Sequence, residues 1–84
     1  MKYLKYPQKI TNLLIDRDLP ESIVNISIKE ASDKYTADSL RLIIRKSGTE
    51  SCIRIMVEAK DKSIVDKMSL QIKDYIEGKL KKLL

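Results

Sequence analysis

The pattern of apolar and polar positions along the chain predicts three strands. Residues 9–17, with the sequence KITNLLIDR, are rich in aliphatic and β-branched side chains, which favour a strand. Two later segments, residues 39–46 and 52–59, alternate with the two-residue period of strands that bury one face. The side chains expected on those buried faces are Leu40, Leu42 and Ile44, and Ile53, Ile55 and Val57. A short loop with a glycine separates these two segments, so we expect them to pair as a hairpin.

Apolar residues at spacings of three and four predict a helix over residues 62–83. Its expected buried side consists of Ile64, Val65, Met68, Ile72, Tyr75, Ile76, Leu80 and Leu83. Asp61 or Ser63 is suited to cap its first turn, and Ser63 with Asp66 has the spacing of a capping box. Gly78 weakens the helix by about 1 kcal/mol relative to alanine, so we expect fraying or bending there.

Residues 21–35 permit two interpretations. Val24, Ile26 and Ile28 alternate as in a strand. If the segment is instead a helix, another set of mostly apolar side chains lies together on one side of it. That set is Ile23, Val24, Ser27, Ile28, Ala31 and Tyr35. The length of the segment and the proline at position 20 favour a helix, with Asp18 or a neighbour as its cap.

The predicted order of elements is strand, helix, strand, strand, helix. This order is typical of an α+β fold in which helices pack on one face of an antiparallel sheet, although it leaves the strand order open. A chain of 84 residues provides for one domain. We expect residues 1–8 to be a linker and residues 9–84 to form the domain.

The net charge of +5 is compatible with an anionic ligand, a nucleic acid or a membrane surface. Part of it comes from Lys79, Lys81 and Lys82, which we expect to be the solvated end of a helix. No apolar run approaches the roughly 20 residues that cross a bilayer. The sequence has no histidine, which excludes the usual Cys/His zinc sites and histidine-based triads. The single cysteine, Cys52, cannot form an internal disulfide and fits a cytoplasmic protein.

The segment RKSGTE at residues 45–50 is the candidate site for an anion. Arg45 and Arg54 offer planar guanidinium groups, Ser47 and Thr49 offer hydroxyls, and Gly48 lets a ligand approach the backbone. Across a hairpin the two arginines would lie near each other, and a phosphate between them would relieve their repulsion. The competing interpretation is an ordinary turn between basic strand ends.

Three neighbours of this segment have simpler expected roles. Lys46 is expected to be a solvated side chain, and Glu50, which repels phosphate, to accept hydrogen bonds or pair with an arginine. Cys52 lies within a predicted strand and is expected to pack rather than react.

Residues 45–61, RKSGTESCIRIMVEAKD, closely resemble the phosphate-binding loop of the α-D-phosphohexomutase superfamily. In its phosphoglucosamine mutase branch the segment reads much like R-x-S-G-T-E-P-x-I-R-V-M-V-E-A, and IRIMVEA fits that branch best. Tyr6, Pro7 and Gln8, followed by Asn12, also resemble the start of the last domain of those enzymes. One departure is Ser51, where the family usually has proline.

The resemblance implies a four-domain enzyme that interconverts glucosamine 6-phosphate and glucosamine 1-phosphate, of which this chain is the C-terminal domain. It implies a phosphoserine in the first domain, magnesium held by the second and a sugar-selecting loop in the third. The fourth domain holds the non-reacting phosphate. Carried over, Arg45, Ser47, Gly48 and Thr49 resemble direct phosphate contacts and Arg54 a further one, with no catalytic or metal-binding residue in this chain.

Three alternatives remain open at this stage. The loop is shared with mutases that act on mannose and glucose phosphates. A second alternative is a small basic module for nucleic acid, against which no aromatic pair lies on a strand face for base stacking. A third is an interaction domain that keeps the fold without catalysis. The phosphohexomutase interpretation predicts a phosphosugar substrate and the remaining enzyme domains as partners, with neither nucleic acid nor membrane.

Overall fold

The computed structural model describes residues 6–37, 40–47 and 51–83 of the chain. In this part the elements follow the predicted order. They are β1 (Gln8–Leu14), α1 (Glu21–Tyr35), β2 (Leu40–Lys46), β3 (Cys52–Ala59) and α2 (Lys62–Leu83). The predicted α+β class is therefore confirmed. Gln8, which we placed at the end of the linker, is the first residue of β1.

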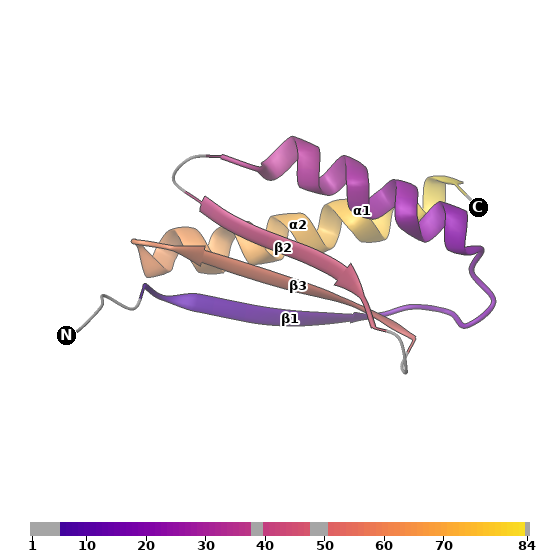
Figure 1. Ribbon diagram of the computed structural model, residues 1–84, viewed down its shortest axis with the longest axis horizontal. Helices are drawn as coiled ribbons and strands as arrows, with labels where there is room; N and C mark the ends of the chain where they lie inside the picture. Colours follow the sequence, from indigo (N-terminus) through magenta and orange to yellow (C-terminus); the bar gives the residue numbers. More distant parts are fainter. Residues whose placement is uncertain (1–5, 38–39, 48–50, 84) are drawn as a thin grey trace.

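The sheet has the strand order β1-β3-β2, which the sequence left open. β3 pairs antiparallel with both neighbours, so the last strand along the chain occupies the centre (Figure 1). β1 and β2 consequently run parallel to each other, joined through α1 with β3 inserted between them, which is a split β-α-β arrangement. As a result, every side chain on β3 has a neighbour on each side.

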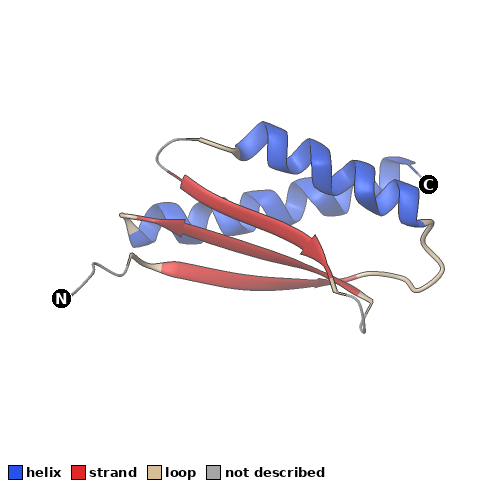
Figure 2. Cartoon of the chain, in the orientation of Figure 1, coloured by secondary structure: helices blue, strands red, loops and turns tan. Residues whose placement is uncertain are grey.

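Both helices cover the same face of the sheet (Figure 2), and the hydrophobic core lies between that face and the helices. Ile53, Ile55 and Val57 of β3 are completely buried there. The helices contribute Val24, Ala31, Val65, Ile72, Ile76 and Leu80 to the same core. The predicted buried faces are thus confirmed in outline, although Ile64 and Leu83 are 43% and 39% exposed. In the part of the chain that the structure describes, the opposite face of the sheet carries no helix.

The start of α1 differs from the prediction. Pro20 occupies the N-cap position and no side chain caps the helix. The backbone N–H of Asp18 donates to Asp16 Oδ1 at 3.0 Å, so these aspartates form a local turn. That turn ends β1 at Leu14, three residues before the predicted end, and the expected Asp18 cap is wrong. The helical interpretation of residues 21–35 is confirmed.

Asp61, one of the two predicted candidates, caps α2. Its Oδ1 accepts hydrogen bonds from the N–H of Ser63 at 2.9 Å and from the Ser63 hydroxyl at 2.8 Å. These bonds stabilise the charged carboxylate and lower the pKa of Asp61 below its ordinary value of 3.8. The predicted capping box is wrong, because Asp66 instead lies 3.9 Å from Lys9 Nζ. α2 continues through Gly78 to Leu83.

A polar and aromatic contact joins the two helices. Lys79 of α2 forms an ion pair with Glu30 of α1. The rings of Tyr35 and Tyr75 meet edge to face, with centroids 5.7 Å apart, and Lys34 lies over both. Lys79 is therefore not the solvated residue that we expected, whereas Lys81 and Lys82 are exposed. No helix in residues 6–37, 40–47 and 51–83 is long and apolar enough to span a membrane.

Candidate anion-binding site

The candidate site lies where β2 and β3 approach their connecting loop. Arg45, Ser47 and Arg54 belong to the described residues, whereas Gly48, Thr49 and Glu50 lie outside them. The structure therefore places three of the five predicted site residues, and the assignment of the other two stays a prediction.

Arg45 of β2 and Arg54 of β3 are direct partners in the strand register. Both are exposed on the face of the sheet that carries no helix, because Ile53 and Ile55 on either side of Arg54 are buried on the other face. Directly opposite residues in an antiparallel pair have Cβ atoms about 4.5–5.5 Å apart. The predicted proximity of the two arginines is confirmed.

The charges of this pair contrast with those of another pair on the same two strands. Arg41 and Glu58 are also register partners, and Arg41 Nη1 lies 3.9 Å from Glu58 Oε1. Opposite charges at such positions stabilise a sheet and like charges destabilise it. Within the described part of the chain, no carboxylate forms an ion pair with Arg45 or Arg54. Their face of the sheet thus presents two adjacent positive charges.

Asn12 of β1 is a site residue that the sequence reasoning missed. It is the register partner of Arg54 on the other side of β3, and its Oδ1 accepts a hydrogen bond from Arg54 Nε at 3.4 Å. Asn12, Arg54 and Arg45 therefore form one row across all three strands. An asparagine within a predicted strand is unusual, and this was the available signal for a special role of Asn12. The row of Asn12, Arg54 and Arg45 depends on the strand order, which the sequence did not reveal.

Hydrogen bonds hold both sides of the connecting loop. The backbone N–H of Ser47 donates to the carbonyl of Cys52 at 2.9 Å, which extends the pairing of β2 with β3. On the other side, Ser51 accepts a hydrogen bond from the N–H of Ile15 at 2.9 Å. Ser47 is half-buried and, two residues after Arg45, belongs to the same side of β2. The backbone flanking the loop is thus fixed to its neighbours.

The remaining neighbours occupy the positions that alternation predicts. Lys46 is exposed but, one residue after Arg45, belongs to the opposite side of β2. Cys52 is a free thiol that is only 4% exposed, in agreement with a packing position. Neither residue joins the row of Asn12, Arg54 and Arg45.

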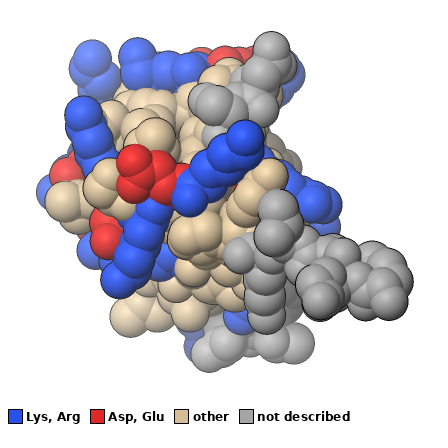
Figure 3. Space-filling view, turned by 90° about the vertical axis from the view of Figure 1, so that its left-hand side faces the viewer, with Lys and Arg blue, Asp and Glu red and all other residues tan. Residues whose placement is uncertain are grey.

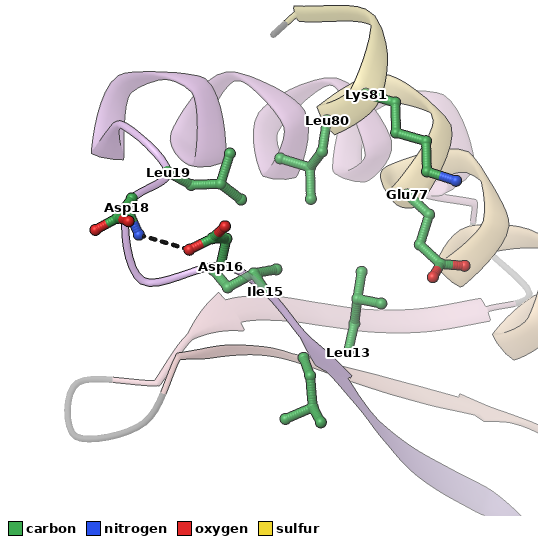
Figure 4. Close-up of a pocket in the computed structure, with 9 residues that line it drawn as sticks. Leu13, Ile15, Asp16, Asp18, Leu19, Glu77, Leu80 and Lys81 are labelled. Carbon is green, nitrogen blue, oxygen red and sulfur yellow. Dashed lines mark hydrogen bonds between the residues drawn. The ribbon is translucent and has the colours of Figure 1, made fainter.

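A hollow of about 370 Å³ lies between the end of β1 and the end of α2 (Figure 4). Its apolar lining includes Leu13, Leu19 and Leu80, and its polar lining consists of Asp16, Asp18, Glu77 and Lys81. Three carboxylates against one ammonium group disfavour a phosphate. This hollow is also on the helix-covered side of the sheet, so it is distinct from the arginine row.

A second hollow, of about 800 Å³, lies at the other end of the sheet, with Arg41, Glu58, Lys60 and Asp61 in its lining. Figure 3 shows this end of the molecule, where acidic side chains lie among the basic ones.

In residues 6–37, 40–47 and 51–83, no three Asp, Glu or Cys side chains gather as metal ligands.

Residues 2–74 match the protein family described as "Phosphoglucomutase/phosphomannomutase, C-terminal domain". The chain belongs to this family. The resemblance of the sequence to the last domain of an α-D-phosphohexomutase is therefore confirmed. The family membership extends beyond the loop to β1, α1 and most of α2, since the matched range contains these elements.

Members of this family with curated names are similar to the chain over most of its length. Phosphoglucosamine mutase of Helicobacter acinonychis is 41% identical over 89% of the chain, and that of Fusobacterium nucleatum is 40% identical over 88%. Phosphoglucosamine mutase of Prochlorococcus marinus is 36% identical over 96%. The chain spans 17%, 17% and 19% of these relatives' lengths, respectively, so it corresponds to one part of them.

A solved structure has the same fold. The crystal structure of Aspergillus fumigatus N-acetylphosphoglucosamine mutase in complex with GlcNAc-6P and magnesium superposes with a TM-score of 0.64. The superposition covers 92% of the chain and 16% of the fungal protein, at 19% sequence identity. At this identity the likeness concerns the fold of the family and not its ligands.

Proposed function

We propose that the chain is the phosphate-binding domain of a phosphoglucosamine mutase, which interconverts glucosamine 6-phosphate and glucosamine 1-phosphate. The observation that carries the proposal is the pairing of Arg45 with Arg54 on the open face of the sheet. Among the described residues, no carboxylate forms an ion pair with either guanidinium group. Such a pair of guanidinium groups is suited to a dianionic phosphate ester, which accepts several charge-assisted hydrogen bonds. The phosphoglucosamine mutases among the relatives support the choice of reaction.

In this function the domain positions its substrate and does no covalent chemistry. A phosphate between Arg45 and Arg54 offsets the repulsion between their like charges, and this favours phosphate binding. Ser47 lies at the end of β2 with its backbone N–H engaged by Cys52, and its hydroxyl is assigned to the phosphate. Gly48 and Thr49 are assigned to the same phosphate from the family motif.

The held phosphate is the one that does not react. Fixing it places the other end of the sugar against the phosphoserine of the first domain, and such positioning accounts for much of the rate of phosphoryl transfer. The phosphoserine, a magnesium ion held by the second domain and the sugar-selecting loop of the third belong to the remaining domains of the enzyme. The chain without those domains is not catalytically competent, and we assign the enzyme to the cytoplasm.

The choice of an amino sugar rests on the relatives. The phosphoglucosamine mutases of Helicobacter acinonychis, Fusobacterium nucleatum and Prochlorococcus marinus match the chain, which supports a phosphorylated amino sugar as the substrate. Mannose and glucose phosphates remain the alternatives, because the arginine row contacts only the phosphate. The nucleic-acid alternative has less support: Tyr35 and Tyr75 pack against each other between the helices and present no stacking platform on the sheet.

Titration of the ¹⁵N-labelled chain with glucosamine 6-phosphate tests the proposal. We expect saturable chemical-shift changes in β2 and β3 near the loop, with Arg45→Ala weakening binding by about 10- to 100-fold. Arg41→Ala is the matched control, because Arg41 lies on the same strand and face but pairs with Glu58. Equal affinity of Arg45→Ala and the unaltered chain, or tighter binding of single-stranded RNA than of the sugar phosphate, contradicts the proposal.

A reconstitution experiment separates an enzyme domain from an interaction domain without catalysis. The chain is added to the first three domains of a phosphoglucosamine mutase, and conversion of glucosamine 6-phosphate is measured. We expect activity that requires the chain and that Arg45→Ala reduces. Activity that is independent of the added chain contradicts the enzyme assignment.

A further inference from the structure

We infer that Asn12 is a positioning residue of the anion site and holds the Arg54 guanidinium in the orientation that binds phosphate. The inference rests on the phosphate-binding function proposed above. Its starting observation is the hydrogen bond from Arg54 Nε to Asn12 Oδ1 at 3.4 Å, between two register partners on β3 and β1.

The bond uses only one of the N–H donors of the Arg54 guanidinium. Arginine has five N–H donors: one on Nε and four on the two terminal nitrogens. With Nε–H directed at Asn12, the two terminal groups remain available for the oxygens of a phosphate. Because Nε can only donate, its partner on Asn12 must be the amide oxygen, as the structure has it.

The direction of the bond follows from the strand order. Asn12 is on β1 and Arg45 is on β2, so they flank Arg54 from opposite sides of the central strand. The bond directs Nε of Arg54 toward Asn12 on β1. Without it, the guanidinium would rotate about its flexible side chain, and binding would cost the entropy of fixing it.

The neutral amide orients Arg54 without cancelling its charge. The Arg41 and Glu58 pair on the same sheet shows the alternative, in which a carboxylate pairs with the guanidinium at 3.9 Å. A carboxylate at position 12 would compete with phosphate for Arg54, whereas an amide does not. The neutral residue is therefore suited to a guanidinium that must remain available to an anion.

The test is an NMR titration of the 84-residue chain and its variants with inorganic phosphate, with the Arg54 Nε–Hε signal as a second readout. We expect Asn12→Ala to weaken phosphate binding by about 3- to 10-fold and to speed solvent exchange of the Arg54 Hε. Asn12→Val should give the same result, and because valine favours strands, loss of the fold would not explain it. Gln8→Ala is the matched control, since Gln8 is also polar and exposed on β1 but faces Glu58.

Asn12→Asp separates positioning from charge. We expect it to keep the Arg54 Hε protected from exchange and yet to weaken phosphate binding at least as much as Asn12→Ala, because the carboxylate neutralises the arginine. Unchanged phosphate affinity and an unchanged Arg54 signal in Asn12→Ala and Asn12→Val overturn the inference. If Arg45→Ala still weakens phosphate binding in that case, the proposed phosphate-binding function is retained. Absence of phosphate binding by the unaltered chain overturns both.

Discussion

Lys79 of α2 forms an ion pair with Glu30 of α1, and its ammonium group lies 6.0 Å from the centre of the Tyr75 ring. The Lys79 side chain is 26% exposed, so water screens this pair less than it screens the chain's more exposed pairs. The contact joins the two helices, and the hydrogen bond with Glu30 raises the pKa of Lys79 above its ordinary value of 10.5.

Removal of this ion pair should lower stability in a pH-dependent way. Because the folded state binds the Lys79 proton more tightly, the contribution is complete below pH 10.5 and disappears as the pH rises through the higher folded-state pKa. We expect Glu30→Gln to lower the unfolding temperature at neutral pH, and the gap to the unaltered chain to narrow at strongly alkaline pH. Thermal unfolding by circular dichroism measures both, and a pH-independent gap contradicts the prediction. Lys81→Ala is the control, because Lys81 is exposed on the same helix.

The cap at Asp61 predicts the opposite pH dependence. The pKa of Asp61 is lowered by its hydrogen bonds with Ser63, so its stabilising effect is present above pH 3.8 and is lost as the pH falls through the folded-state pKa. Asp61→Ala should lower the unfolding temperature at pH 7, whereas Asp61→Asn, which still accepts a hydrogen bond, should lower it less. Once the pH is below the folded-state pKa of Asp61, the variants and the unaltered chain should converge. Asp74→Asn, at an exposed position within α2, is the control and should change little.

The sequence predicted the elements better than the contacts between them. Hydrophobic periodicity indicated all five elements, because it depends on residues close in the chain. Asn12 was missed because its partner Arg54 is 42 residues away and the strand order was open. Lys79 was assigned to solvent because only the helix packing brings Glu30 beside it. The Asp18 cap was wrong because Asp16 forms a turn with the backbone of Asp18 instead.

Gly78→Ala should stabilise the chain. A Cβ added at Gly78 meets no atom within 4 Å, and the residue lies inside α2. Alanine in an exposed helix interior is favoured over glycine by about 1 kcal/mol, which corresponds to a rise of about 4–8 °C in the unfolding temperature of a small domain. Thermal unfolding checks this value. An unchanged or lower unfolding temperature would show that α2 does not persist as a helix at this position.

The buried hydroxyls of Ser27 and Ser69 predict a second stabilising change. Among the residues that the structure describes, neither Oγ has a hydrogen-bond partner, and the two residues are 0% and 2% exposed. A buried polar group without a partner is unfavourable, so Ser27→Ala and Ser69→Ala should each raise the free energy of unfolding by about 1 kcal/mol. Chemical denaturation measures it. Ser69→Val is the contrasting variant, because its extra volume within a packed interface should destabilise the fold.

Ser51→Pro should strengthen phosphate binding by restoring the residue that the family motif usually has. Ser51 uses its carbonyl, which proline keeps, to accept the hydrogen bond from Ile15. A proline that fits the native backbone restricts the backbone at position 51 before phosphate binds, an effect of about 0.4–1 kcal/mol. The dissociation constant for inorganic phosphate should therefore fall by about 2- to 5-fold while Ile15 keeps its hydrogen-exchange protection. Ser51→Ala, which does not restrict the backbone, is the control and should bind inorganic phosphate as the unaltered chain does. Weaker phosphate binding by Ser51→Pro would show that Ser51 has a backbone conformation that proline cannot adopt.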